Sequence, residues 1–283
     1  MAITFSDLGS QAPIGNLLIV DGLNIAFRWK HQGVLDFKYE YARTVESLAK
    51  SYNAGTIIVL ADGGSSYRKN LLPTYKANRK EKYAEQTPQE EKEFAMFMAE
   101  FSDTLTLIKK KHPVFQFKGV EADDIAAYIS MNLDKYNFDE CWMISSDRDW
   151  DLLITDKVSR FSTVTRKEVT LDTWDEHYDF EVEDYITFKC LTGDKGDNVP
   201  GIPGIGPKRA VEIMNQYGNI FDIYAAVPLE GKYKYIQSLN ENAEQLLLNV
   251  ELMDLVTYSE EAIGEKNKQV IDLGIQEHLN DKN

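Results

Sequence analysis

The sequence predicts an α/β fold, with a mostly parallel central sheet flanked by helices. Three short apolar runs bounded by polar turn residues are typical of strands buried on both faces of a sheet, and they cover residues 17–20, 56–60 and 141–144. Residues 114–117 are a fourth candidate strand. Helical patterns at residues 41–52 and 123–133 lie between these runs and give the alternation of strand and helix expected of a parallel sheet.

Two stretches interrupt this alternation. Residues 63–112 form a long insert between two strands that one crossover could join, and long insertions in compact domains usually have a function. After Tyr178 the strand signals disappear, and short helices separated by Gly and Pro follow. Residues 158–171 predict a hairpin that closes the sheet region. We therefore expect a core domain at residues 1–178, which includes the insert, and a helical region at residues 179–283.

The composition is that of a globular protein, because 43% of the 283 residues are hydrophobic, which is ample for a buried core. No apolar run approaches the length of about eighteen residues that spans a bilayer. Residues 1–15 lack the layout of a secretory signal. We therefore expect a cytoplasmic monomer with no membrane partner. Cys141 and Cys190 each lie in an apolar run and are expected to be buried thiols.

The net charge of −15 argues at first against a nucleic-acid partner, because binding to phosphates normally requires a basic surface. The distribution of charge changes this interpretation. Residues 67–82 contain Glu81 as their only acid, against the basic residues Arg68, Lys69, Lys76, Arg79, Lys80 and Lys82. A strongly basic segment is thus embedded in an acidic chain. Carboxylates gathered around divalent ions would account for part of the acidic excess.

Aspartates follow three of the predicted strands: Asp21, Asp62 and Asp147. Because ligands collect at the carboxyl ends of parallel strands, we expect these side chains to converge. Six further acids are expected to join them, namely Glu121, Asp123, Asp124, Asp149, Asp194 and Asp197. Each acid alone has an ordinary explanation as a turn residue or a helix cap. Together they need counter-charge, and oxygen ligands without a His or Cys cluster favour two Mg²⁺ or Mn²⁺ ions over zinc.

Two divalent ions can bind the attacking and leaving oxygens of a phosphodiester and lower the pKa of a bound water. The expected reaction is therefore phosphodiester hydrolysis. Glycoside cleavage is a weaker interpretation, because it needs only two carboxylates and no basic insert.

Residues 201–210 predict a glycine-rich hairpin between two short helices, within an element at about residues 193–218. Glycines such as Gly204 and Gly206 let backbone N–H groups approach phosphate closely, and with the Lys208–Arg209 pair they suit contact with a DNA backbone. Such contacts position a duplex and do not read its sequence. An ordinary Gly-Pro loop is the alternative.

The insert contains Tyr75, Lys76 and Arg79, followed by Lys80 and Lys82. On a helix, Lys76 and Arg79 would share a face, and Tyr75 could stack on a base. All five are candidate DNA contacts. The alternative is a basic helix that is simply solvated.

At this point the motifs resemble those of a known family, the 5′ nucleases or flap endonucleases, which include the N-terminal nuclease domain of bacterial DNA polymerase I. The motifs are IVDG at 19–22, AD at 61–62, YKANR at 75–79, VEADD at 120–124, SDRD at 146–149 and GDKGDN at 193–198. They occur in the family's order. The resemblance is closest to the stand-alone enzymes of large tailed phages, which would place the protein in the host cytoplasm.

The resemblance implies a PIN-like core and two metal sites. The first would contain Asp21, Asp62, Glu121 and Asp123, with Asp124 nearby, and the second would contain Asp147, Asp149, Asp194 and Asp197. The insert would be a helical arch that supplies Lys76 and Arg79 as catalytic cations beside Asp21 and Asp62. The hairpin would be a helix-three-turn-helix duplex clamp that also holds K⁺. Arg148, between two expected ligands, is a departure that could alter the charge of the second site.

The function implied by the resemblance is removal of flaps and RNA primers during replication, by 5′ to 3′ exonuclease and structure-specific endonuclease activity. The implied partners are branched, flapped or nicked DNA, RNA–DNA hybrids and a replicative polymerase bound by free association. Two alternatives remain. A PIN-type ribonuclease would lack both the arch and the hairpin, and a non-catalytic junction-binding protein would tolerate loss of the acids.

Overall fold

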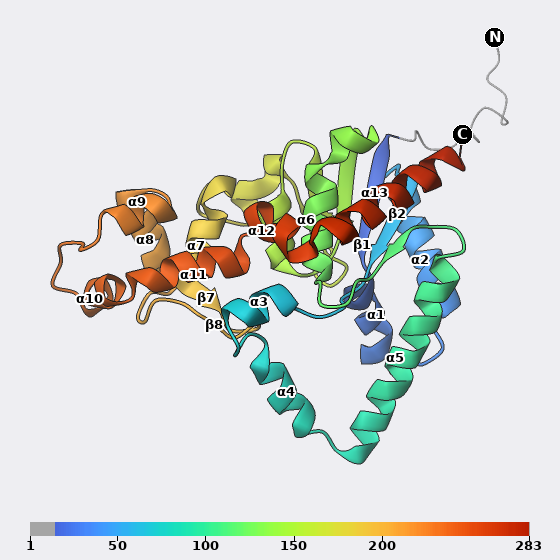
Figure 1. Cartoon of the computed structure of the whole chain (residues 1–283), viewed down its shortest axis with the longest axis horizontal. Helices are drawn as coiled ribbons and strands as arrows, with labels where there is room; N and C mark the ends of the chain where they lie inside the picture. Colours follow the sequence, from blue (N-terminus) through green and yellow to red (C-terminus); the bar gives the residue numbers. More distant parts are fainter. Residues whose placement is uncertain (1–14, 283) are drawn as a thin grey trace, which may run out of the picture.

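The computed structural model describes residues 15–282, apart from the side chains of residues 80–83. Its centre is a six-stranded sheet in the order β3-β2-β1-β4-β5-β6, and only the last pair is antiparallel (Figure 1). The predicted α/β fold is therefore confirmed. The strands are β1 (Asn16–Asp21), β2 (Thr56–Leu60), β3 (Val114–Phe115), β4 (Glu140–Ile144), β5 (Val158–Phe161) and β6 (Glu168–Val169). The hairpin expected at residues 158–171 is the β5–β6 pair, whereas the strand expected at 114–117 spans only two residues.

Both faces of the sheet are covered, which explains why β1 is apolar at successive positions. Successive side chains of a strand point to opposite faces. Leu18 and Val20 pack in a cluster with α1 (Gly22–His31), α2 (Lys38–Ser51) and α5 (Pro88–Ile108). Leu17 and Ile19 pack in a second cluster, which contains residues of α6 (Ala122–Met131), α12 (Leu255–Ile263) and α13 (Glu265–Asn280).

The insert is helical, as expected. It contains α3 (Ser66–Leu71), α4 (Ala77–Ala84) and α5, and Figure 1 shows α4 and α5 as the two sides of an arch that projects from the sheet. Helix α5, the second side of the arch, begins with a capping box. The side chain of Thr87 accepts from the amide of Glu90, and the Glu90 carboxylate accepts from the amide of Thr87.

The remaining helices form a third hydrophobic cluster beside the sheet. They are α7 (Tyr185–Thr192), α8 (Pro207–Tyr217), α9 (Ile220–Ala225), α10 (Lys234–Glu241) and α11 (Ala243–Met253). Separate from this cluster, short 3₁₀ helices cover Leu133–Tyr136, Arg148–Leu153, Leu171–Glu176 and Val182–Asp184. The expectation that no strand follows Tyr178 is wrong in one detail. Two-residue strands, β7 (Gly193–Asp194) and β8 (Val199–Pro200), pair in a small antiparallel ladder.

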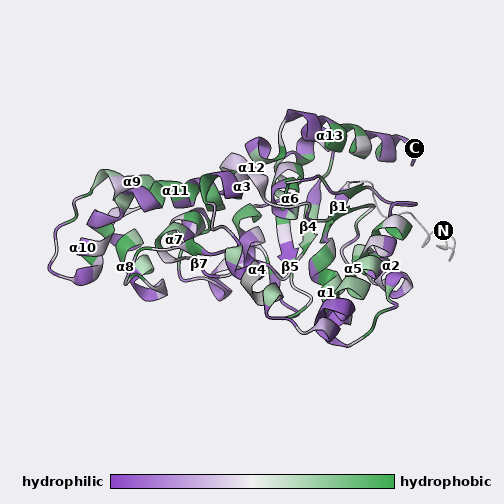
Figure 2. Cartoon of the chain, turned by 60° about the horizontal axis from the view of Figure 1, so that its bottom comes forward, coloured by the Kyte–Doolittle hydropathy of each residue, from purple (hydrophilic) through white to green (hydrophobic). Residues whose placement is uncertain are grey.

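The last two helices return to the sheet. Leu255 and Ile263 of α12, with Ile271 and Ile275 of α13, belong to the same cluster as Leu17 of β1. In Figure 2, polar and apolar residues mix along α13, as expected of a helix with one face on a core. The helical region expected at residues 179–283 thus contributes its end to the core of the sheet. Within residues 15–282, no helix has the length and apolar character needed to cross a membrane.

Candidate active site

Acidic side chains gather where the parallel strands end. Asp21 is the last residue of β1, and its carboxylate accepts from the amide of Asn24 at 3.2 Å and from the hydroxyl of Ser145 at 2.7 Å. Asp62 follows β2 and accepts from the amide of Ala122, the first residue of α6, at 2.8 Å. These bonds tie the ends of β1 and β2 to β4 and α6.

Asp147 and Asp123 extend this group. Asp147 caps the short helix Arg148–Leu153 by accepting from the amide of Asp149 at 2.9 Å. The carboxylate of Asp123, in the first turn of α6, accepts from the indole of Trp150 at 2.6 Å. Both aspartates therefore contact the short helix Arg148–Leu153, Asp147 as its cap and Asp123 through the indole of Trp150.

Mutual repulsion links these carboxylates. Burial raises the pKa of Asp21 to about 7, and the charges of Asp62 and Asp147 add to the increase. Burial also raises the pKa of Asp123, with Asp147 and Asp62 contributing. For Asp149, burial first and then Asp147 and Asp194 raise the pKa to about 6, against the opposing effect of Lys189. This part of the protein therefore favours added positive charge.

One small cavity, of about 10 Å³, brings residues of both expected metal sites together. It is lined by ten residues, among which Arg68, Tyr75, Asp123, Asp149, Asp194 and Asp197 are the polar ones. Arg148, which the sequence suggested as a modifier of the second site, instead lines a separate cavity with Ser146 and His177.

Arg68 is a buried cation that the sequence analysis missed. Its side chain, from α3, donates to Glu121 at 2.7 Å and to both oxygens of Asp124, at 2.8 and 2.7 Å. Asp124 therefore departs from the expected role of metal ligand, because both of its oxygens are paired with one guanidinium. Nothing in the sequence distinguishes Arg68 from the neighbouring basic residues of the insert.

Lys76 and Arg79 meet on Asp197. The ammonium of Lys76 lies 3.3 Å from Asp197 and also pairs with Glu121, and Arg79 donates to Asp197 at 2.6 Å. Burial opposes ionisation of Asp197, but the two cations outweigh it and lower the pKa of that carboxyl. The prediction that Lys76 and Arg79 share a helix face is wrong, because Lys76 has a positive φ of 56° and precedes α4. The two side chains converge through a common partner instead.

Tyr75 does not stack on a base in this arrangement, contrary to the sequence expectation. Its side chain is only 4% exposed and packs in the cluster of the C-terminal helices. Its hydroxyl donates to Asp197 at 2.8 Å and faces Glu121 at 3.3 Å. The side chains of Lys80 and Lys82, two further candidate DNA contacts, lie outside the described residues.

Lys189 is a second cation that the sequence analysis missed. It lies in α7, pairs with Asp149 and is 3.3 Å from Asp194. Burial opposes its charge, but Asp149 and Asp194 raise its pKa. A lysine among the apolar residues of α7 is a signal that could have identified it.

The glycine hairpin connects α7 and α8. Ile202 and Ile205 are buried, whereas Gly204 and Gly206 are exposed. A Cβ on Gly201 would lie 2.3 Å from the carbonyl of Thr192, so this position needs glycine for close contact of two backbone segments.

The two basic residues of the hairpin differ. Lys208 is exposed in the first turn of α8. The guanidinium of Arg209 donates to the carbonyl of Gly204 at 2.6 Å and lies 4.7 Å from the ring centroid of Tyr235. Arg209 therefore also shapes the hairpin, while Lys208 is more available to a phosphate.

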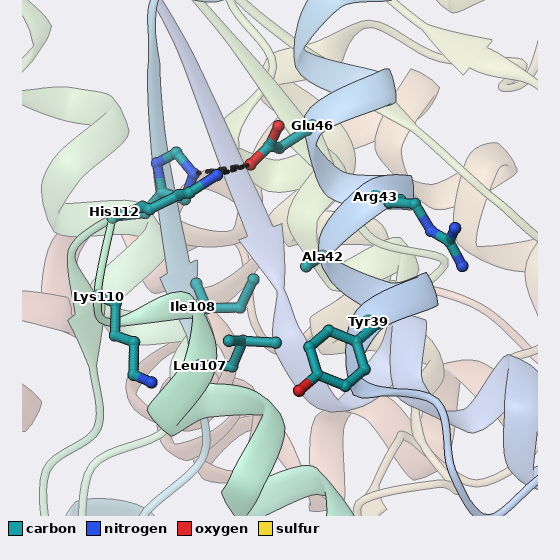
Figure 3. Close-up of a pocket in the computed structure, with 9 residues that line it drawn as sticks. Tyr39, Ala42, Arg43, Glu46, Leu107, Ile108, Lys110 and His112 are labelled. Carbon is teal, nitrogen blue, oxygen red and sulfur yellow. Dashed lines mark hydrogen bonds and ion pairs between the residues drawn. The ribbon is translucent and has the colours of Figure 1, made fainter.

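A larger cavity lies elsewhere. Its volume is about 450 Å³. Figure 3 shows the side chains around it, which come from α2, from the end of α5 and from the turn that follows α5. Its lining includes Tyr39, Arg43, Glu46, Leu107 and His112 and contains none of the clustered aspartates.

Comparison with known proteins identifies the family. Residues 16–179 match the model of the 5′-3′ exonuclease N-terminal resolvase-like domain, and residues 180–271 match that of the 5′-3′ exonuclease C-terminal SAM fold. The chain belongs to the 5′-3′ exonuclease family. The flap endonuclease of Escherichia phage T5 is 47% identical over 260 residues, which cover 91% of this chain and 89% of that protein.

Solved structures agree with this 5′-3′ exonuclease assignment. The T5 D15 protein co-crystallized with metal ions superposes with a TM-score of 0.86 at 46% identity, covering 94% of this chain and 98% of that one. A T5 D15 flap endonuclease variant in a pseudo-enzyme–product complex with DNA and metal ions gives a TM-score of 0.87, with the same identity and coverage. The activity of this chain is that of a structure-specific 5′ nuclease.

Proposed function

We propose that this nuclease hydrolyses phosphodiester bonds near the 5′ ends of flapped, nicked or otherwise branched DNA, using two Mg²⁺ or Mn²⁺ ions. The observation that carries the proposal is the shared cavity, which is lined by acids of both expected metal sites and touched by the base of the arch through Tyr75. Phosphodiester chemistry with two ions requires such a convergence of carboxylates.

The chain fits hard divalent ions. Every proposed metal ligand is a carboxylate, and carboxylate oxygens are the donors that hard divalent ions prefer. The pKa values of Asp21, Asp123 and Asp149 are raised, and a bound cation would lower them again. As the side chains stand, no three acidic, His or Cys residues of the described chain form a group that could hold an ion. Lys76, Lys189 and Arg68 pair with several of the proposed ligands. Ligation would therefore release Lys76 from Glu121 and Lys189 from Asp149 in exchange for metal ions.

We assign the first ion to Asp21, Asp62, Glu121 and Asp123, and the second to Asp147, Asp149, Asp194 and Asp197. Asp124 is left out because Arg68 occupies both of its oxygens. When bound there, two such ions would supply a lower pKa for the attacking water and positive charge beside the leaving oxygen.

Lys76 and Arg79 act on the substrate phosphate. Both lie at the base of the arch and both are held by Asp197, so they are placed beside the carboxylates before DNA arrives. Positive charge positioned in advance stabilises the charge that develops in the transition state. Tyr75 does not touch the substrate, and its hydroxyl orients Asp197.

The glycine hairpin binds the duplex part of the substrate. The exposed Gly204 and Gly206, with Lys208 at the start of α8, suit the approach of a phosphate backbone, and a K⁺ ion at the hairpin would assist it. The arch, with its basic first side, receives the single-stranded 5′ end. Because backbone contacts do not read bases, the proposal extends to RNA-primed 5′ ends, with flaps supplied by a replicative polymerase.

A cleavage assay tests this proposal. Flapped DNA, nicked DNA, covalently closed circular duplex DNA and single-stranded RNA are incubated with and without Mg²⁺, and all but the closed circle are labelled at the 5′ end. We expect Mg²⁺-dependent cleavage of the first two and no cleavage of the closed circle. Binding of flap DNA without any cleavage would support a non-catalytic junction-binding protein. Cleavage of single-stranded RNA alone would support a PIN-type ribonuclease.

A further inference from the structure

Arg68 joins three parts of the molecule. It lies in α3, at the base of the arch, and the residue is only 3% exposed. Besides Glu121 and Asp124, it donates through Nε to the carbonyl oxygen of Leu252 at 2.7 Å. The base of the arch, the start of α6 and the end of α11 thus meet at one guanidinium.

The position of Arg68 is strongly constrained. The last four carbonyls of a helix have no partner within it, and Leu252 is the penultimate residue of α11. Asp124 accepts from Nη1 and Nη2 together, which is the planar two-bond geometry that arginine forms with carboxylates. The guanidinium is therefore fixed both in position and in rotation.

Glu121 takes its orientation from this fixed group. Its Oε2 accepts from Nη1 of Arg68 at 2.7 Å, while its Oε1 faces Lys76 and the hydroxyl of Tyr75. Because one oxygen is held, the other is directed to the side where Asp197 and Lys76 lie. A buried glutamate without such a partner has three side-chain torsions free to turn it away.

We infer that Arg68 is a positioning residue, which holds Glu121 in the orientation that binds the first metal ion. The inference rests on the proposed function, in which Glu121 is a ligand. Partners behind a ligand commonly change metal affinity by about 10-fold to 100-fold when removed.

Coulomb's law alone predicts the opposite sign. Removing a positive charge close to a cation site would strengthen binding of the cation. If Arg68 positions Glu121, removal of Arg68 instead weakens binding of the cation. Metal affinity therefore separates the two effects without any measurement of cleavage.

The experiment is a Mn²⁺ titration of the full chain without DNA, followed by the electron paramagnetic resonance signal of the free ion. Arg68→Met alone leaves Asp124 unpaired and is expected to destabilise the fold. The main variant therefore combines Arg68→Met with Asp124→Leu, which replaces the buried pair by apolar groups. Asp124→Leu alone leaves Arg68 on Glu121 and serves as its reference.

A matched control exists in the same chain. Arg160 is also buried, pairs with both oxygens of Asp151 and donates to the carbonyl of Ser145 at 2.9 Å. Asp151 is not a proposed ligand. Arg160→Met combined with Asp151→Leu therefore removes a comparable pair without touching Glu121.

We expect the Arg68 double variant to bind one Mn²⁺ about tenfold or more weakly than Asp124→Leu, with the Arg160 double variant close to wild type. Equal or tighter binding by the Arg68 double variant would overturn the inference, as would an equal loss in the Arg160 double variant. If the wild-type protein bound no Mn²⁺, the metal assignment under the proposed function would fail instead.

Discussion

The ammonium of Lys76 lies 3.3 Å from Oδ2 of Asp197, and the backbone N–H of Lys76 donates to the carbonyl oxygen of Asp197 at 2.8 Å. Lys76 begins the first side of the arch, whereas Asp197 lies in the loop between β7 and β8. The two contacts therefore join the arch to the helical C-terminal region at the point where the carboxylates gather. A displacement of either segment would change the catalytic centre.

Lys76→Ala should cut the single-turnover rate of flap cleavage by on the order of a hundredfold or more, while the dissociation constant for flap DNA changes much less. An ammonium that stabilises the transition state contributes to rate more than to affinity. Arg79→Ala should share both effects. Lys69 is an exposed basic residue of α3, and Lys69→Ala serves as the control, which should cleave flap DNA at the wild-type rate. Weaker binding with an unchanged rate would leave the arch only an electrostatic role.

Asp147→Asn should raise the melting temperature measured in EDTA. The charge of Asp147 raises the pKa of Asp21, Asp123 and Asp149, so removing it relieves repulsion when no divalent ion is bound. Asparagine still caps the following short helix, since its side-chain oxygen accepts as aspartate's does. A lower melting temperature in EDTA would mean that the carboxylates do not repel one another.

Tyr75→Phe should destabilise the protein by about 1–2 kcal/mol, because it removes the hydroxyl that donates to the half-buried Asp197 and faces the buried Glu121. Urea denaturation in EDTA measures this change. Affinity for single-stranded DNA should stay unchanged, because the ring is buried. Loss of single-strand affinity at unchanged stability would restore the idea that Tyr75 contacts DNA directly.

Lys208→Ala should weaken duplex binding equally for all sequences and reduce the slope of log affinity against log salt by about one. Arg209→Ala should lower duplex affinity more than Lys208→Ala does, because Arg209 also donates to the carbonyl of Gly204 and contacts the ring of Tyr235. Binding isotherms at several salt concentrations, on duplexes of unrelated sequence, measure both. A loss confined to particular sequences would contradict contact with the backbone alone.

The contribution of His112 to the free energy of unfolding should fall as the pH decreases from about 6.5 towards 4, so the stability of wild type should fall relative to a variant without this group. Burial lowers the pKa of His112 from 6.5 to about 4, with the charge of Lys282 contributing. Between these values the unfolded chain binds a proton at this position that the folded chain does not, so acid favours unfolding. Urea denaturation of wild type and His112→Gln across this range, with EDTA present, isolates the effect. An equally steep pH dependence in the variant would exclude His112 as its cause.

The sequence predicted the positions of Asp21, Asp62 and Asp147 because the end of a buried parallel strand is a local signal with one spatial meaning. It did not identify Arg68, whose partners lie on α6 and α11 and are brought together only by the fold. Tyr75 was expected to meet DNA because an aromatic residue in a basic segment gives no sign of burial. Its burial is decided by packing with residues of the C-terminal helices.

The central claim is that the carboxylates at the ends of β1, β2 and β4 form a metal-dependent catalytic centre for cleavage near 5′ ends. The most direct test of this claim compares wild type with Asp147→Asn. It measures single-turnover cleavage of a 5′-labelled flap in Mg²⁺ and, in parallel, the affinity of each protein for the flap. We predict Mg²⁺-dependent cleavage by wild type and none by the variant, with flap affinity within about tenfold, because metal ligands serve the transition state more than docking. Undiminished cleavage by Asp147→Asn, or a loss of binding in proportion to the loss of activity, would contradict the claim.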